Sequence, residues 1–188
     1  MPDSKSRPTH VAFLRGINVG GNNPIKMADL VKVVESLKCR DIKTILASGN
    51  ILFSQPAGNN AISSATFEAA IAKSCKKQIR VIVLSLKEIH SLVDSAPFKG
   101  YSESKTTRLH TTYFSSAPKL KLKLPHKSEK GDLTIVAIGK HTVCWVAHLI
   151  PGRHSGMCMA TLEKMLGKDV TTRSWNTVLM IAAFSERS

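Results

Sequence analysis

A glycine-rich stretch near the N-terminus has residue types that could hold an anion. The stretch "FLRGINVGGNN" (13–23) follows an apolar run and leads through Pro24 into an amphipathic run. Such a corner between a strand and a helix places the free N–H groups of the helix N-terminus where they favour negative charge. It matches neither the Walker phosphate loop nor the dinucleotide fingerprint, so the alternative is a tight turn alone. The residues predicted to bind an anion here are Arg15, Asn18, Gly20, Gly21 and Lys26.

A second polar motif, "VTTRSWNTV" (170–178), stands near the C-terminus. In it Arg173 precedes a predicted helix, and Asn176 lies in the first turn of that helix. If two halves of the protein pack sheet edge to sheet edge, both side chains could line one polar cleft together with Arg15 and Asn18. The alternative interpretation is that Arg173 and Asn176 only brace the C-terminal helix.

The densest basic segment of the chain lies at 118–131. Its lysines could follow a phosphate backbone, although a run of charge is often only a solvated face. Recognition of single-stranded RNA on a sheet uses aromatic side chains, and the matching strand "NILFSQ" offers only Phe53. We therefore expect any nucleic acid to bind chiefly through charge. The lysines of this predicted basic surface are Lys119, Lys121, Lys123, Lys127 and Lys130.

The sequence offers little support for a metal site or for a nucleophilic catalytic site. Cys144, His148, His154 and Cys158 are zinc-type ligands. However, residues four apart on a strand lie about 13 Å from each other, too far to share one ion. The segment "GRHSG" (152–156) is not a nucleophile elbow. We predict no metal and no cofactor, and the sequence assigns no catalytic residue.

The composition is that of a folded and strongly basic protein. The 188 residues include 43% hydrophobic residues and carry a net charge of +14 that is spread over both halves of the chain. This charge attracts nucleic acid, nucleotides or acidic surfaces, although it could serve solubility alone. No apolar run is long enough to cross a membrane, no signal peptide is recognisable, and the four cysteines form no C-x-x-C pair. We therefore expect a cytoplasmic protein that does not bind membranes.

The first half shows the order strand, helix, strand, strand, helix, strand, which is typical of the split β-α-β, or ferredoxin-like, arrangement. Ser85 and Glu88 are spaced as a capping box, which predicts a further helix that stops before Pro97. The predicted elements are a strand at 10–19, a helix after Pro24, a hairpin at 43–55, a helix from Ser64 and a strand at 80–86.

The second half is predicted to repeat this order with weaker signals. The segment 118–131 is ambiguous, because its leucines alternate as in a strand while prolines bracket them. The overall prediction is an α+β protein with two ferredoxin-like (alpha-beta plait) subdomains in tandem, at 1–97 and 98–188, and a C-terminal helix. The remaining predicted elements are a strand at 107–115, a hairpin at 132–150, a helix at 155–167, a strand at 170–172 and a last helix that begins at Ser174.

The chain contains four motifs, "FLRGINVGGNNPIKMADL" (13–30), "SGNILF" (48–53), "APF" (96–98) and "VTTRSWNTV" (170–178). Together they resemble the domain-of-unknown-function family 1697. The resemblance implies a compact bacterial-type cytosolic protein of two alpha-beta-plait subdomains, and it implies no established activity. This chain has Ser174 where the family usually has Asn, and Ala96 where Asn commonly precedes the Pro-Phe pair. The family is usually more helical at 118–127.

The charge and the glycine corner lead to one main functional hypothesis, a binding protein for a phosphate-bearing partner, either nucleic acid or nucleotide. One alternative is a small-molecule enzyme with a polar cleft between the subdomains. Another is a homo-oligomeric scaffold without catalysis. The sequence does not determine the ligand, the reaction or the oligomeric state.

Overall fold

The computed structural model describes residues 7–20, 23–56, 61–115, 120–150 and 156–186. Over these residues the protein is a mixed α/β protein with two antiparallel sheets and five helices. The chain forms two compact units: unit 1 consists of Met1–Ser91 with Leu179–Ser188, and unit 2 of Leu92–Val178. The predicted subdomain boundary after residue 97 stays a prediction.

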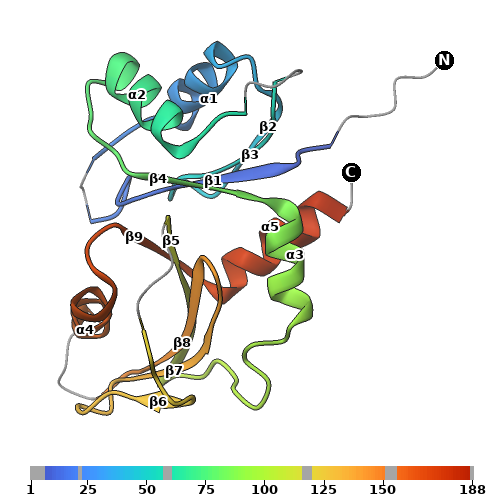
Figure 1. The fold of residues 1–188 in the computed structure, drawn as a ribbon. Coiled ribbons are helices and arrows are strands. Elements are labelled where there is room, and N and C mark those ends of the chain that lie inside the picture. The colour runs from blue at the N-terminus through green and yellow to red at the C-terminus, as the bar shows by residue number, and fades with distance from the viewer. Residues whose placement is uncertain (1–6, 21–22, 57–60, 116–119, 151–155, 187–188) are drawn as a thin grey trace. The chain divides into compact units, whose positions relative to one another are not determined.

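Unit 1 contains a four-stranded sheet with the strand order β2-β3-β1-β4, in which every neighbouring pair is antiparallel. The predicted order strand, helix, strand, strand, helix, strand is confirmed. Two helices, α1 and α2, lie on the same face of this sheet (Figure 1). Leu30 of α1 and Phe67 of α2 are fully buried there against Phe53 of the sheet. The elements are β1 (His10–Leu14), α1 (Met27–Ser36), β2 (Arg40–Ile45), β3 (Asn50–Ser54), α2 (Ser64–Cys75) and β4 (Val81–Ser85).

The predicted capping box begins helix α3 (Leu86–Asp94) directly after β4. The Ser85 hydroxyl accepts a hydrogen bond from the Glu88 N–H at 3.2 Å, and a Glu88 carboxylate oxygen accepts one from the Ser85 N–H at 2.9 Å. These bonds satisfy donors that a helix N-terminus otherwise leaves unpaired. The sequence pattern therefore predicted both the start of the helix and the contacts that make it.

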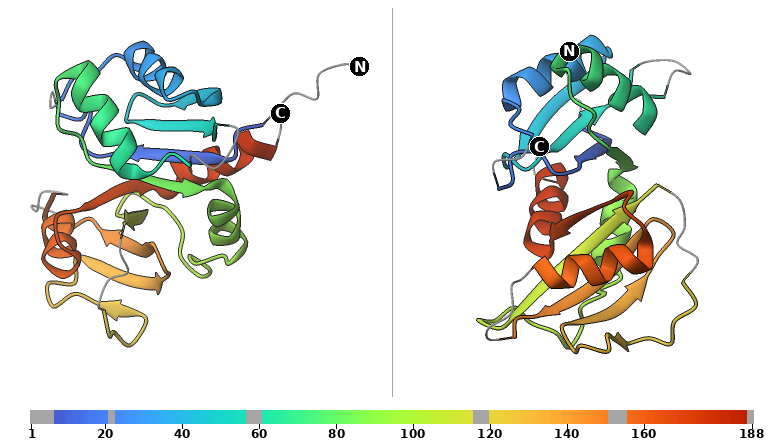
Figure 2. Two further views of the ribbon diagram at one scale, coloured as in Figure 1. Left: turned by 45° about the horizontal axis from the view of Figure 1, so that its top comes forward. Right: turned by 90° about the vertical axis from the view of Figure 1, so that its left-hand side faces the viewer.

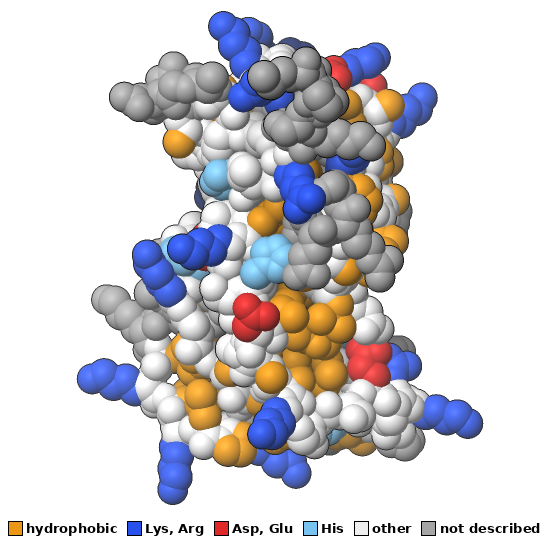
Figure 3. Space-filling view, turned by 90° about the vertical axis from the view of Figure 1, so that its right-hand side faces the viewer, with side chains coloured by type: hydrophobic (Ala, Val, Ile, Leu, Met, Phe, Trp, Pro, Cys, Tyr) orange, Lys and Arg blue, Asp and Glu red, His pale blue; other side chains and the backbone are white. Residues whose placement is uncertain are grey.

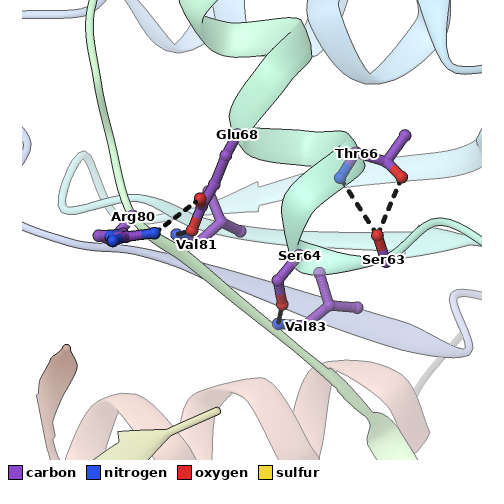
Figure 4. Close-up of polar contacts among 7 residues, drawn as sticks. All are labelled: Ser63, Ser64, Thr66, Glu68, Arg80, Val81 and Val83. Atoms are coloured by element: carbon purple, nitrogen blue, oxygen red, sulfur yellow. Dashed lines mark hydrogen bonds and ion pairs between the residues drawn. The ribbon is translucent and has the colours of Figure 1, made fainter.

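Strand β4 lies at an edge of the sheet, and side chains of α2 bind its backbone (Figure 4). The Val81 N–H donates to Glu68 Oε1 at 2.9 Å, and the Val83 N–H donates to Ser64 Oγ at 3.1 Å. Because Ser64 and Glu68 are four residues apart on a helix, they share one face of α2 and reach alternate residues of the strand. An exposed strand edge is open to unwanted pairing, so these contacts protect β4.

Unit 2 contains a five-stranded sheet with the order β6-β7-β8-β5-β9, again antiparallel throughout. Helix α4 covers one face of it (Figure 2). On that face Leu162 packs in one cluster with Trp145 and Phe114. Another cluster joins Phe98 and Trp175, whose rings meet edge to face at 4.9 Å. The elements are β5 (Thr107–Phe114), β6 (His126–Lys127), β7 (Leu133–Ile138), β8 (Thr142–His148), α4 (Gly156–Leu166) and β9 (Val170–Ser174). Helix α5 (Trp175–Glu186) follows β9, and from Leu179 onward it belongs to unit 1.

The ambiguous segment between β5 and β7 contains no helix within its described residues, 120–131. Its regular part is the two-residue strand β6, which pairs with β7. Leu120 and Leu122 pack against the cluster that contains Trp145. Leucines at every second position share one side of an extended chain but not of a helix, which explains why this segment departs from the helix that the family resemblance suggests.

Local signals also located several turns and caps correctly. The hairpin predicted around Gly49 joins β2 to β3, and the one predicted at Gly139 joins β7 to β8. The Ser174 hydroxyl accepts a hydrogen bond from the Thr177 N–H at 3.3 Å at the start of α5, as expected of an N-cap. Among the helices that the structure describes, none is both long and apolar enough to cross a bilayer.

Candidate anion-binding surface

The glycine corner of unit 1 is closed by the side chain of Asn18. Its Nδ2 donates to the Ile25 carbonyl and to the Ala47 carbonyl, both at 2.9 Å, while its Oδ1 accepts from the Ile25 N–H at 2.9 Å. The Asn18 N–H in turn donates to the Asn23 carbonyl at 3.4 Å. Both amide hydrogens of Asn18 are thus used within the protein. The side chain stabilises the corner instead of presenting a donor to solvent.

The other predicted residues of the corner differ in their exposure. Lys26 is the exposed N-cap of α1, and its side chain makes no capping hydrogen bond. Gly20 is exposed and adopts a φ of 56°. Arg15 is half-buried, and its N–H donates to the Arg80 carbonyl. Gly21 lies outside the described residues.

Arg173 lies on β9 of unit 2 and is only 7% exposed. Its Nη1 donates to Thr171 Oγ1 at 2.9 Å and to the Thr172 carbonyl at 2.8 Å. Burial lowers the pKa of Arg173 to about 10, against a smaller effect of nearby Tyr113, which raises it. Burial also raises the pKa of Tyr113 well above its ordinary value. Arg173 therefore forms part of the buried polar structure of this sheet.

Asn176 is exposed in the first turn of α5 and is bound to a carboxylate. Its Nδ2 donates to Glu103 Oε2 at 3.1 Å, and Glu103 Oε1 accepts from the Leu109 N–H at 3.3 Å. Glu103 thus links the start of α5 to the start of β5. This contact agrees with the alternative interpretation, in which Asn176 braces the C-terminal helix.

The predicted residues of the glycine-rich corner lie in unit 1, and those of the motif at 170–178 lie in unit 2. Arg15, Asn18, Gly20 and Lys26 all belong to the connection between β1 and α1. Arg173 and Asn176 flank the junction of β9 with α5. The polar cleft that would combine the two groups stays a prediction.

The predicted basic surface is the most exposed of the candidate sites. Lys121, Lys123, Lys127 and Lys130 are all exposed; we call these four residues the lysine segment. Within the described chain, no ion pair or hydrogen bond engages their ammonium groups. Lys119, the fifth predicted lysine, lies outside the described residues. The four described ammonium groups are therefore available to a partner.

Two different contacts hold the lysine segment on unit 2. Leu120 and Leu122 alternate with Lys121 and Lys123, so that burial of the leucines directs the lysines outward. Lys127 belongs to β6 and is paired with Thr134 of β7.

A tight turn follows β6 and carries Lys130. In this turn the Gly131 N–H donates to the Ser128 carbonyl at 2.9 Å. The Lys127 Cε lies 3.5 Å from the position that a Cβ on Gly131 would occupy. The Lys127 side chain therefore runs along the turn that carries Lys130.

The candidate zinc ligands make other contacts. Cys144 Sγ lies 3.8 Å from Thr111 Oγ1, and His148 Nε2 lies 2.9 Å from Thr134 Oγ1. Cys158 donates to the Asp132 carbonyl. Within the described residues, no group of three or more His, Cys, Asp or Glu side chains could hold a metal ion, and His154 lies outside them.

Asp132 is a buried carboxylate that the sequence analysis did not single out. It is 3% exposed, and its Oδ1 accepts from Ser128 Oγ at 2.6 Å. Its Oδ2 has no hydrogen-bond partner among the described residues. The sequence carries no signal for this residue, because an Asp that follows a turn glycine is usually exposed.

Comparison with known proteins identifies the family. The family model "Protein of unknown function (DUF1697)" matches residues 8–143. The protein belongs to this family. A search of curated proteins finds no match. Among solved structures, the conserved bacterial protein SP0830 from Streptococcus pneumoniae is similar, with a TM-score of 0.70 and 19% identity over 97% of this chain and 100% of that one. At that identity the likeness establishes a shared fold.

Proposed function

We propose that this DUF1697 protein binds a phosphate-bearing partner, a nucleic acid or a nucleotide, through the lysine segment of unit 2. The observation that carries the proposal is the group of four exposed ammonium groups that have no partner among the described residues. Lysine ammonium groups are point charges suited to phosphate. A cytoplasmic location, where such partners are abundant, stays part of the proposal.

The charge of the whole protein supports the same function. Its net charge is +14, and lysine and arginine side chains project from the face drawn in Figure 3, with fewer acidic ones between them. Such a field raises the rate at which an anionic partner arrives. The exposed side chain of Lys26 in unit 1 adds a second predicted contact for an anion.

Binding of a fluorescein-labelled 20-mer of deoxythymidine, followed by fluorescence anisotropy at 50 mM and 200 mM NaCl, tests the proposal. One variant replaces Lys121, Lys123, Lys127 and Lys130 by Gln. A matched control replaces four exposed lysines of unit 1, namely Lys32, Lys43, Lys73 and Lys87, by Gln. Both variants lose four positive charges, so they separate the effect of position from the effect of net charge.

We expect the affinity of the wild type to fall at least tenfold between the two salt concentrations, because binding releases counterions. We also expect the lysine-segment variant to lose at least tenfold in affinity at 50 mM NaCl and the control variant less than threefold. Equal losses in the two variants would contradict the assignment to this surface. No binding by the wild type would contradict the function itself.

We further infer that the two units are related ferredoxin-like folds. The order β7-β8-β5-β9 of unit 2 corresponds to β2-β3-β1-β4 of unit 1, with the segment that contains β6 standing where unit 1 has α1. This correspondence supports the tandem arrangement predicted from the sequence. It also explains why the lysine segment has no counterpart in unit 1.

A further inference from the structure

We infer that His110 and Glu103 act as a pH-sensitive switch at the start of α5. When the His110 imidazole takes up a proton, the contact between Glu103 and Asn176, which holds the first turn of α5, is weakened. This inference does not depend on the function proposed above, because none of these residues belongs to the lysine segment. The switch concerns the helix in which the chain passes from unit 2 to unit 1, after Val178.

The side chain of His110 is packed so that one ring nitrogen makes no hydrogen bond. The imidazole stacks on the indole of Trp145, with ring centroids 4.6 Å apart and planes inclined by 25°. The Nδ1 atom is buried and has no hydrogen-bond partner among the described residues. A neutral imidazole can carry its hydrogen on the other nitrogen, whereas the protonated ring has an N–H on both. Protonation therefore leaves a buried, charged donor without an acceptor, which is costly.

The groups that act on His110 come from several elements. Burial lowers the pKa of His110 below its ordinary value of 6.5, the charge of Glu103 opposes this effect, and Arg108 adds to it. A hydrogen bond with the Arg173 backbone, on β9, raises the pKa. Helix α4 contributes Cys158 to the cluster that contains the indole, and burial raises the pKa of that thiol. Among these groups Glu103 is the only anion, so the protonated imidazole is drawn toward it.

The carboxylate of Glu103 already has two partners. Its Oε2 accepts a hydrogen bond from Asn176 Nδ2 at 3.1 Å, and its Oε1 accepts one from the Leu109 N–H at 3.3 Å. Leu109 directly precedes His110, and His110 is paired across β5 and β9 with Ser174, the N-cap of α5. A charged imidazole N–H competes with the uncharged amide of Asn176 for the same carboxylate, and charge-assisted hydrogen bonds are the stronger ones. Proton uptake therefore weakens the contact that Glu103 makes with α5.

The same argument gives the direction of the change in stability. Below pH 6.5 the unfolded chain takes up a proton on His110 more readily than the folded protein does, because the pKa is lowered on folding. The unfolded state then binds more protons, and the free energy of unfolding decreases as the pH falls. Urea unfolding at pH 7.5 and pH 5.5 should show this decrease in the wild type and a smaller one in His110→Gln.

An NMR titration of the whole protein from pH 8 to pH 5 tests the switch itself. The ring Hε1 resonance of His110 reports its protonation, and the side-chain amide resonances of Asn176 report the contact with Glu103. We expect the His110 midpoint to lie below 6.5 and the Asn176 resonances to shift with the same midpoint. Glu103→Gln keeps an acceptor for Asn176 and removes the charge, so it should lower the His110 midpoint.

A matched pair of histidine variants identifies the group that titrates. His110→Gln should reduce the shift of the Asn176 resonances at least fivefold. His141→Gln should leave that shift unchanged, because His141 is also half-buried in unit 2 but has its Nδ1 3.3 Å from the Phe114 carbonyl oxygen.

Three results would overturn the inference. These are a His110 midpoint at or above 6.5, Asn176 resonances that do not follow the titration of His110, and an equal shift of those resonances in His110→Gln. If His110→Gln does not fold, the wild-type and Glu103→Gln titrations decide the matter by themselves.

Discussion

Asn18 and Ile25 form two hydrogen bonds with each other. The side-chain amide of Asn18 pairs with the backbone N–H and the backbone carbonyl of Ile25, as the backbone of a neighbouring strand would. The Ile25 N–H donates to Asn18 Oδ1, and Asn18 Nδ2 donates to the Ile25 carbonyl, both at 2.9 Å. Gln55 and Ile62 make the same pair of contacts, at 2.6 Å and 3.3 Å. In both cases the isoleucine lies two residues before a helix, α1 or α2. The connections from β1 to α1 and from β3 to α2 are therefore closed in the same way.

Replacing Asn18 by Gly should destabilise the protein by roughly 1–3 kcal/mol, because the backbone groups of Ile25 and Ala47 lose their partners. Glycine accepts the positive φ of 54° at this position, so the loss reports on the hydrogen bonds and not on backbone strain. Urea unfolding measures the change. Asn23→Gly is the control, because Asn23 also has a positive φ but its Nδ2 makes one bond to the described residues, to the Gly16 carbonyl at 3.2 Å. Equal losses in the two variants would contradict the role given to Asn18.

Replacing Gln55 by Ala should increase the hydrogen-exchange rate of the Ile62 amide at least tenfold, because its acceptor is removed. The free energy of unfolding should fall by about 1–2 kcal/mol. Gln78→Ala, at an exposed position, is the matched control and should leave both quantities unchanged. An unchanged exchange rate at Ile62 in Gln55→Ala would show that the contact does not form in solution.

Gly49 packs so closely that a side chain cannot be added. A Cβ there would lie 2.8 Å from Leu14 Cβ and 2.8 Å from Ile17 Cδ1, at a φ of +81°. Gly49→Ala should therefore cost about 2–5 kcal/mol of stability through strain and overpacking. Gly16→Ala tests strain alone, because Gly16 has a φ of +62° with no atom within 4 Å of its Cβ position. Urea unfolding should show a clearly smaller loss for Gly16→Ala.

Glu68 accepts a hydrogen bond from the Val81 N–H of the edge strand β4 and forms an ion pair with Arg80. Two substitutions separate the contributions of these contacts to stability. Glu68→Gln keeps an acceptor for the Val81 N–H and loses the ion pair with Arg80, whose side chain is 62% exposed. The loss should be under about 0.5 kcal/mol, because exposed ion pairs contribute little. Glu68→Ala should cost about 1–2 kcal/mol, because the amide of β4 then lacks its acceptor. Equal unfolding free energies for the two variants would contradict this assignment.

The free energy of unfolding should fall between pH 9 and pH 11 because of the ionisation of the Cys144 thiol. Burial raises the pKa of the Cys144 thiol to about 11 from an ordinary value of 9.0, against a smaller opposing effect of the hydrogen bond with Thr111. In this range the unfolded chain releases the thiol proton while the folded protein retains it. The unfolded state therefore binds fewer protons, and the free energy of unfolding decreases as the pH rises, by roughly 1–3 kcal/mol. Urea unfolding at a series of pH values should show a shallower decline for Cys144→Ala. An identical pH dependence would exclude Cys144 as the cause.

Local signals in the sequence determined most of the secondary structure. The capping box at Ser85 and Glu88 and the N-cap Ser174 were predictable because each depends on neighbours three residues away. The hairpin at Gly49 was predictable for a similar reason. The family motifs were also sufficient to identify DUF1697, because a motif match needs no coordinates.

Only the tertiary structure decided whether the polar side chains of the predicted sites bind other parts of the protein or face solvent. The side-chain amide of Asn18 donates hydrogen bonds to the carbonyls of Ile25 and of Ala47, which is 29 residues away in the chain. Arg173 is buried because β9 pairs with β5. The residues next to Arg173 in the sequence do not indicate this pairing. The outward direction of Lys121 and Lys123 follows from the burial of the leucines before them, which need the core of unit 2. A residue's type limits its chemistry, but distant parts of the chain determine whether its polar groups are used internally or left for a partner.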